Sequence, residues 1–315
     1  MDFIARLKGF FSGREERPEI GDSVFLLGDF MGMYSTSPNG RWLVSWMDAD
    51  PAQRGVGGSR PSGDGAYLLY DKAANRVVVR GRTPRPSAGR VANNGTFCLE
   101  DRDFGSALSG TLRVFSCSGH AIAQVPVTAN IVRSALSENG AFALIHTANS
   151  PTDDGSKLFL VDLQGGKVRY RVTPSAGWPD RYGFVEEQGM VIAYLEGLGE
   201  FRYGPDGAFI DEDKLDRAML DSPRYEHAIP AAEKLLSQAG TSEASAQEAL
   251  RILLRVRQNG ADMADAWHAR CLKLIGQAHE ALGENRDAIA AYDQALSIDP
   301  KIGVKRRRDS LQKRL

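Results

Sequence analysis

Cysteine, net charge and long apolar runs are all scarce in this sequence. The three cysteines, Cys98, Cys117 and Cys271, have no C-x-x-C spacing, which argues against a disulfide framework and against a zinc motif. No apolar run approaches the roughly 20 residues of a membrane-spanning helix. The formal net charge of −1 gives no overall field for nucleic acid or anionic membranes. We therefore expect a cytoplasmic protein with reduced thiols, no metal and no cofactor.

The first twelve residues are the apolar exception. Arg6 and Lys8 interrupt this segment, and it is too short and too charged for a secretory signal. It is interpreted as a helix that packs on the chain itself or on a partner, with the inner face of a membrane as the alternative. Residues 1–20 are assigned to this segment and its polar tether. Its apolar side chains are Phe3, Ile4, Leu7, Phe10 and Phe11.

A repeated turn organises residues 21–210. Each copy has a short apolar strand, a tight turn ending in glycine, and a stronger apolar strand. A two-residue hairpin turn needs positive φ, which glycine and asparagine tolerate, and asparagine precedes the first three of these glycines. The four marker glycines, Gly40, Gly95, Gly140 and Gly189, lie 55, 45 and 49 residues apart.

A second hairpin follows each marker turn, so each unit contains four short strands, a period typical of β-propellers. The turn Ser37-Pro38-Asn39-Gly40 and the strand ends Tyr70-Asp71 and Val161-Asp162 resemble those of WD40-like and TolB-like propellers. The resemblance implies an all-β domain of about four four-stranded units. Val24–Leu27 is interpreted as a closing strand donated to the last unit. An open array, or a ring completed by another chain, is the alternative.

Composition changes after Ile210 to good helix formers, which predicts an all-α domain over 211–315. Ser245 to Glu248 is interpreted as a capping box. Asn259-Gly260 and Pro300 are interpreted as helix ends. The five expected helices run from about 222 to 240, 245 to 259, 262 to 282, 285 to 299 and 301 to 315.

The third and fourth of these helices resemble one tetratricopeptide repeat, over roughly residues 269–302. The preceding pair of helices is a looser copy, so a short array of α-hairpins is expected. The resemblance implies a groove for extended peptides or helices, lined by Arg270, Lys273, Gln277 and Glu280. It assigns structural positions to the small residues Gly276, Ala288 and Ala295, to the large Tyr292 and to the terminating Pro300.

Two surface features are further candidates for binding. The long strand-connecting loops share one face of the predicted propeller-like domain, and arginine and tryptophan are typical anchors of interfaces. The alternative is that these loops are only solvated. The loop candidates are Arg54, Arg60, Arg82, Arg85, Arg102, Trp178 and Arg181. The second feature is the basic cluster Lys305, Arg306, Arg307 and Arg308, either a site for anionic lipid or nucleic acid or a solvated helix whose charges suit its C-terminal dipole.

No catalytic motif stands out. The five histidines have no metal-ligand spacing, and no Gly-x-Ser-x-Gly elbow is present. The glycine-rich run 55–65 lacks the lysine and following helix of a phosphate-binding loop. We expect a non-enzymatic scaffold with protein partners, including a second copy of the chain as one option. The alternatives are a membrane- or nucleic-acid-associated adaptor, although nucleic acid is disfavoured, and a propeller enzyme.

Overall fold

The computed structural model describes residues 18–48, 62–102, 104, 108–237 and 242–314. They divide into two compact units. The first contains the described residues up to Tyr194 together with Arg202–Ile210, and the second contains Leu195–Phe201 and the chain from Asp211 onward. The predicted apolar N-terminal segment lies outside the described residues. No helix in the described part is both long and apolar enough to cross a membrane.

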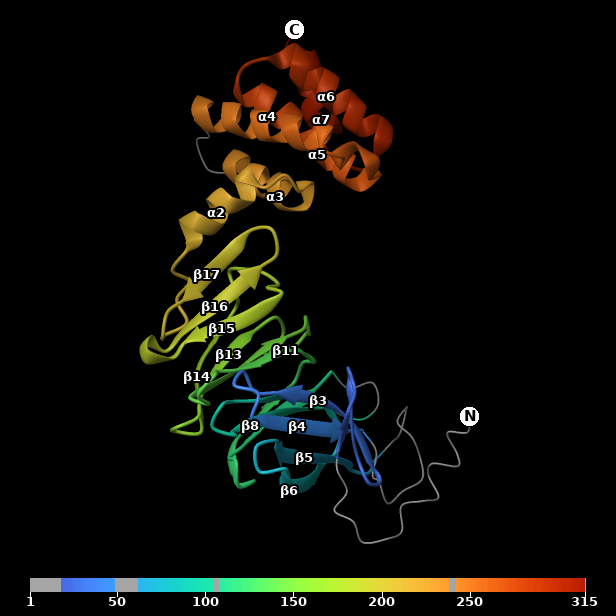
Figure 1. The fold of residues 1–315 in the computed structure, drawn as a ribbon. Helices are drawn as coiled ribbons and strands as arrows, with labels where there is room; N and C mark the ends of the chain where they lie inside the picture. The colour runs from blue at the N-terminus through green and yellow to red at the C-terminus, as the bar shows by residue number, and fades with distance from the viewer. Residues whose placement is uncertain (1–17, 49–61, 103, 105–107, 238–241, 315) are drawn as a thin grey trace. The chain divides into compact units, whose positions relative to one another are not determined.

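The first unit is built from four antiparallel sheets, in which each strand pairs with its neighbours in the sequence (Figure 1). The first sheet has β1 Glu19–Ile20, β2 Val24–Leu27, β3 Phe30–Thr36, β4 Trp42–Met47, β5 Gly65–Asp71 and β6 Arg76–Thr83. The second has β7 Pro86–Val91, β8 Phe97–Arg102, β9 Gly110–Phe115 and β10 Ala121–Val127. The third has β11 Ile131–Leu136, β12 Phe142–Thr147, β13 Leu158–Asp162 and β14 Lys167–Val172, and the fourth has β15 Arg181–Val185, β16 Met190–Leu195 and β17 Gly199–Tyr203.

The marker glycines lie in the turns where the sequence predicts them. Each turn joins two successive strands of one sheet, namely β3 to β4, β7 to β8, β11 to β12 and β15 to β16. The φ angles of Gly40, Gly95, Gly140 and Gly189 are 72°, 84°, 74° and 63°, a left-handed conformation that a side chain would strain. The predicted repeat of antiparallel hairpins is therefore confirmed.

Hydrogen bonds join these turns from one sheet to the next. The backbone N–H of Asn39 donates to Oδ1 of Asn93 (2.8 Å), and that of Asn93 donates to the carbonyl of Glu138 (2.6 Å). The backbone N–H of Asn139 then donates to Oε1 of Glu186 (2.7 Å). Residues that are far apart in the sequence thus align the four turns at one end of the unit.

Apolar side chains fill the spaces between consecutive sheets. One face of the first sheet, including Trp46 and Tyr67, packs against Phe97 and Leu99 of the second. The other face of the second sheet packs against the third in the same way. Among the described residues, the extensive contacts between sheets all join neighbours in this series. No closed ring is seen there, so propeller closure stays a prediction.

The interpretation of Val24–Leu27 as a closing strand of the last unit is wrong. These residues form β2, which pairs with β3 of the first sheet, with Val24 opposite Met33. Phe25 and Leu27 are buried with Leu43 and Leu68 on the face of the first sheet that lies away from the second. Side chains of β2 therefore cover the outer apolar face of the sheet to which β2 belongs. Without them a neighbouring sheet would have to bury this face.

The second unit contains six α-helices among its described residues, one more than predicted. Glu212–Asp221 forms the additional helix because its acidic first turn suits a helix start. The N-cap of α4 is Ser242 and not the predicted Ser245. The Ser242 side chain accepts a hydrogen bond from the backbone N–H of Ser245. The helices are α2 Glu212–Asp221, α3 Tyr225–Ser237, α4 Glu243–Gln258, α5 Asp265–Ala281, α6 Asn285–Ile298 and α7 Lys305–Gln312. Short 3₁₀ turns lie at Glu186–Gln188 and Ala261–Met263.

The α5–α6 hairpin has the close approach that its small residues predict. Gly276 faces the buried ring of Tyr292, and a β-carbon built on Gly276 would overlap that ring. Ala288 and Ala295 are buried on the same side of α6, and α6 ends at Ile298, before Pro300. The close packing of the two helices thus involves small residues on both sides of the Tyr292 ring.

We expect Gly276→Ala to destabilise the helical unit by about 1–3 kcal/mol, because a methyl group must displace the Tyr292 ring from a filled site. Helix propensity alone would favour alanine, so a raised melting temperature would contradict this packing. Thermal unfolding followed by the helical circular dichroism signal measures the effect. The double variant Gly276→Ala/Tyr292→Leu should recover part of the loss, since leucine vacates space.

Candidate functional site

The helical unit contains an open groove with a volume of about 480 Å³ between α3, α5 and α7. Gln277 and Glu280, two of the four predicted groove residues, line it from α5. The positions lie one turn apart on a single helix face, because residues three and four apart project on the same side. The remaining lining residues are Glu233, Leu236, Ser237, Ala281 and Arg307.

Two ion pairs between helices fix the polar side chains of this groove. Arg270 of α5 binds the carboxylate of Glu233 on α3. Arg307 of α7 binds the carboxylate of Glu280 with Nε 2.5 Å from Oε2. The hydroxyl of Tyr292 donates to the same oxygen of Glu280 over 2.9 Å, so this carboxylate is held from two sides.

Lys273, the fourth predicted groove residue, is half-buried on α5, and neither Lys273 nor Arg270 is among the residues that line the groove. Lys273 has no ion-pair partner among the described residues, in contrast to Arg270. The sequence reading missed Glu233, because the register of α3 could not be deduced from its pattern. The sequence pattern placed Arg307 in a basic cluster and not in the groove. The pattern does not indicate that the start of α7 lies against α5.

The model of the tetratricopeptide repeat family matches residues 269–302, which are the α5–α6 hairpin and its exit. The match covers the helices whose close packing is described above and reproduces the predicted repeat. No curated protein matches the sequence. The resemblance to this repeat therefore extends over one hairpin, and the remaining helices are only loosely similar to it.

The loop candidates of the first unit do not gather into one site. Arg54 and Arg60 lie outside the described residues, and Arg82 and Arg102 have exposed side chains. Arg85 has a structural role: its guanidinium lies 3.0 Å from Asp48, and its backbone N–H donates to buried Asp101.

Asp101 is a buried junction between the long loops and the second sheet. Its carboxylate accepts from the hydroxyl of Thr83 (2.7 Å) and from Nε of Arg113 (2.8 Å). Arg102 and Arg113 line a groove of about 380 Å³ beside it. Since these bonds neutralise the carboxylate internally, Asp101 stabilises the fold and leaves no free charge for a ligand.

Trp178 is exposed and stacks on His146, a buried histidine at the packing face between the third and fourth sheets. The ring centroids are 4.6 Å apart. The Tyr182 hydroxyl lies 3.0 Å from Nδ1 of His146, while Nε2 has no partner among the described residues. Burial and the nearby Arg133 lower the pKa of His146 to about 4. Arg181 stacks on the ring of Tyr194 at 3.4 Å.

The basic cluster differs from its predicted setting. Because α7 begins at Lys305, the cluster lies in the first turn of the helix, where cations oppose the dipole, and the predicted C-terminal match is wrong. Arg307 is paired with Glu280, and Arg308 lies 3.0 Å from Asp309. Two of the four charges are thus neutralised within the chain, which weakens the case for an anionic-lipid or nucleic-acid site.

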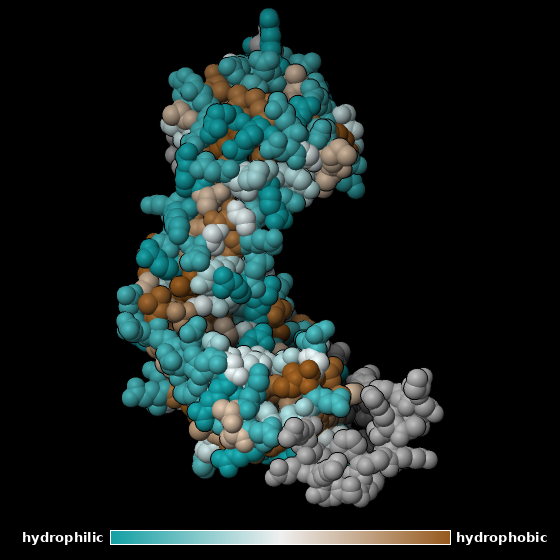
Figure 2. Space-filling view, in the orientation of Figure 1, coloured by the Kyte–Doolittle hydropathy of each residue, from teal (hydrophilic) through white to brown (hydrophobic). Residues whose placement is uncertain are grey.

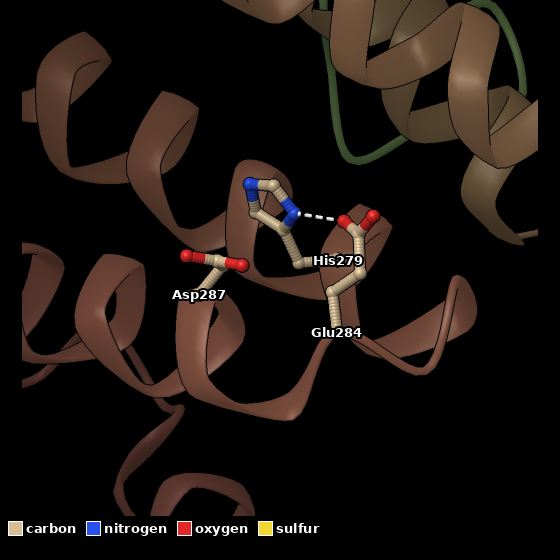
Figure 3. A group of neighbouring side chains, drawn as sticks. All are labelled: His279, Glu284 and Asp287. Carbon is tan, nitrogen blue, oxygen red and sulfur yellow. Dashed lines mark hydrogen bonds and ion pairs between the residues drawn. The ribbon is translucent and has the colours of Figure 1, made fainter.

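His279, Glu284 and Asp287 form a group of potential metal ligands at the turn between α5 and α6 (Figure 3). Their ligand atoms lie within 4.8 Å of one another. Nδ1 of His279 is 2.6 Å from the Glu284 carboxylate, and the N–H of Glu284 donates to the carbonyl of His279 in the closing turn of α5. These bonds, with the preference for acidic residues at a helix start, account for the arrangement without an ion.

We expect the stability of the first unit to fall as the pH drops from 6.5 to about 4 because of His146. The unfolded chain binds a proton in this range and the folded chain does not, so stability is complete above pH 6.5 and is lost toward pH 4. The full difference corresponds to roughly 3 kcal/mol.

Denaturant unfolding of the full chain at several pH values measures this slope. His146→Gln should reduce the slope of the unfolding free energy against pH by an amount equivalent to up to one bound proton. His120→Gln, on an exposed turn, should leave the slope unchanged. An unchanged slope in His146→Gln would show that another group controls the acid response.

Proposed function

We propose that this chain is a non-enzymatic scaffold that binds a segment of another protein in the groove between α3, α5 and α7. The proposal depends on one observation: the matched repeat presents fixed polar side chains of α5 in an open groove. Tetratricopeptide repeats serve protein–protein interaction in general, and the groove has room for an extended or helical segment. The four sheets would then act as a rigid scaffold, with propeller closure by this chain or a second copy as part of the proposal.

The chemistry of the groove suits a peptide. Glu280 is held by Tyr292 and Arg307 before any partner arrives, so little side-chain entropy is lost on binding. The amide of Gln277 can both donate to and accept from peptide groups.

The protonation state of two buried cysteine thiols favours a binding role over a catalytic one. Burial raises the pKa of the Cys98 and Cys271 thiols to about 12, so both are protonated near neutral pH. A thiol in this state is a poor nucleophile and a poor metal ligand. The proposal therefore assigns these residues to the cores of their units.

A library of immobilised peptides probed with the full chain tests the proposal. Gln277→Ala should weaken the binding of the enriched peptides by about tenfold, because it removes a polar side chain from the groove lining. Arg286→Glu is the matched control, since this exposed residue of α6 lies outside the groove lining and should have little effect. Absence of enriched peptides, or equal losses in Gln277→Ala and Arg286→Glu, would overturn the assignment.

A further inference from the structure

The strands that precede the four marker turns lie in one row, which we call the inner edge, and β3 lies within its own sheet between β2 and β4. The strands β3, β7, β11 and β15 contact one another in this order. Within the described part of the chain, this strand has a strand neighbour on one side only in the second, third and fourth sheets. The backbone groups on its other side are available to an added extended chain, as in strand-addition complexes.

Charge on this inner edge has one sign. The four strands contain the arginines Arg90, Arg133 and Arg181 and no aspartate or glutamate, although the whole chain has 39 basic and 40 acidic residues. All three arginines are exposed, and none has an ion-pair partner among the described residues. Arg85, by contrast, is neutralised by Asp48 in the loops. The near-equal numbers of basic and acidic residues in the whole chain therefore do not hold on the inner edge, which is basic.

The arginines occupy equivalent faces of successive strands. Arg90 pairs with Cys98, whose side chain packs toward the third sheet. Arg133 pairs with His146, which contacts Tyr182 of the fourth sheet. Because directly paired residues share a face, both guanidiniums arise on the face directed to the following sheet.

Exposed apolar side chains accompany the charges. Met31 and Met33 on β3 are 59% and 57% exposed, and Val132, next to Arg133, is 45% exposed. Figure 2 shows hydrophobic side chains gathered on the surface over β3. Methionine adapts its shape to varied partners, which suits a binding surface. We call Met31, Met33, Arg90, Val132, Arg133 and Arg181 the inner-edge strip.

We propose that the inner-edge strip binds an extended protein segment that carries both carboxylate and aliphatic side chains. Guanidinium groups pair with carboxylates in a bidentate geometry, and the exposed methionines and valine bury the aliphatic groups. Free strand edges favour a peptide backbone over a nucleic acid or a lipid surface, because neither of these offers alternating N–H and C=O groups. This surface is separate from the helical groove.

Fluorescence anisotropy of the full chain tests the proposal with a labelled peptide of alternating glutamate and leucine. The triple variant Arg90→Glu/Arg133→Glu/Arg181→Glu should weaken binding by at least about tenfold, and added salt should weaken it in the parent chain. Met31→Gln/Met33→Gln should cause a smaller loss of about threefold. Gln277→Ala, which alters the helical groove, should leave this binding unchanged.

The control variant Arg76→Glu/Arg80→Glu/Lys167→Glu has the same charge change on the outer strands β6 and β14 and should bind like the parent. Circular dichroism melting confirms that each variant is folded. Equal losses in the two triple variants would overturn the proposal, as would no binding of the glutamate–leucine peptide. Tighter binding of an oligothymidylate with the same dependence on the strip would identify a polyanion site instead, and binding of a lysine–leucine peptide would exclude charge recognition.

Discussion

Burial of the apolar faces between consecutive sheets is the constraint on which the first unit depends. Trp46 and Tyr67 of the first sheet, for example, can leave water only by packing on Phe97 of the second. A series of sheets packed in this way must also cover the outer apolar face of its first sheet. Phe25 and Leu27 of β2 cover that face with side chains of the same sheet.

The hydrogen-bonded turns set the register of this series. Asn93 accepts from one turn and donates to the next, so a single residue joins three sheets at one end. The glycines that allow these turns fix where each strand reverses, and the strand that precedes each turn lies at the inner edge. The packing of consecutive sheets buries their faces. Side chains of the inner edge stay exposed, and they include arginines and methionines.

Period and glycine placement were predictable from the sequence because they are local properties. The close pair Gly276 and Tyr292 was likewise predictable from a repeat with fixed spacing. Pairings over long distances were not: nothing in the local pattern indicates that Val24–Leu27 adds to the first sheet or that Arg85 is held by Asp48 and Asp101. Arginines on loops look alike in a sequence, and only the fold separates those with internal carboxylates from those without.

The two proposed surfaces differ in how their charges are held. In the helical groove, Glu280 and Arg307 are already paired, so a partner gains from preorganised shape and must compete with an internal ion pair for any new one. On the inner-edge strip, Arg133 and Arg181 have no carboxylate partner among the described residues, so a partner that brings one adds an interaction without breaking another. Selectivity for charge is therefore expected mainly from the sheets, and selectivity for shape mainly from the helices.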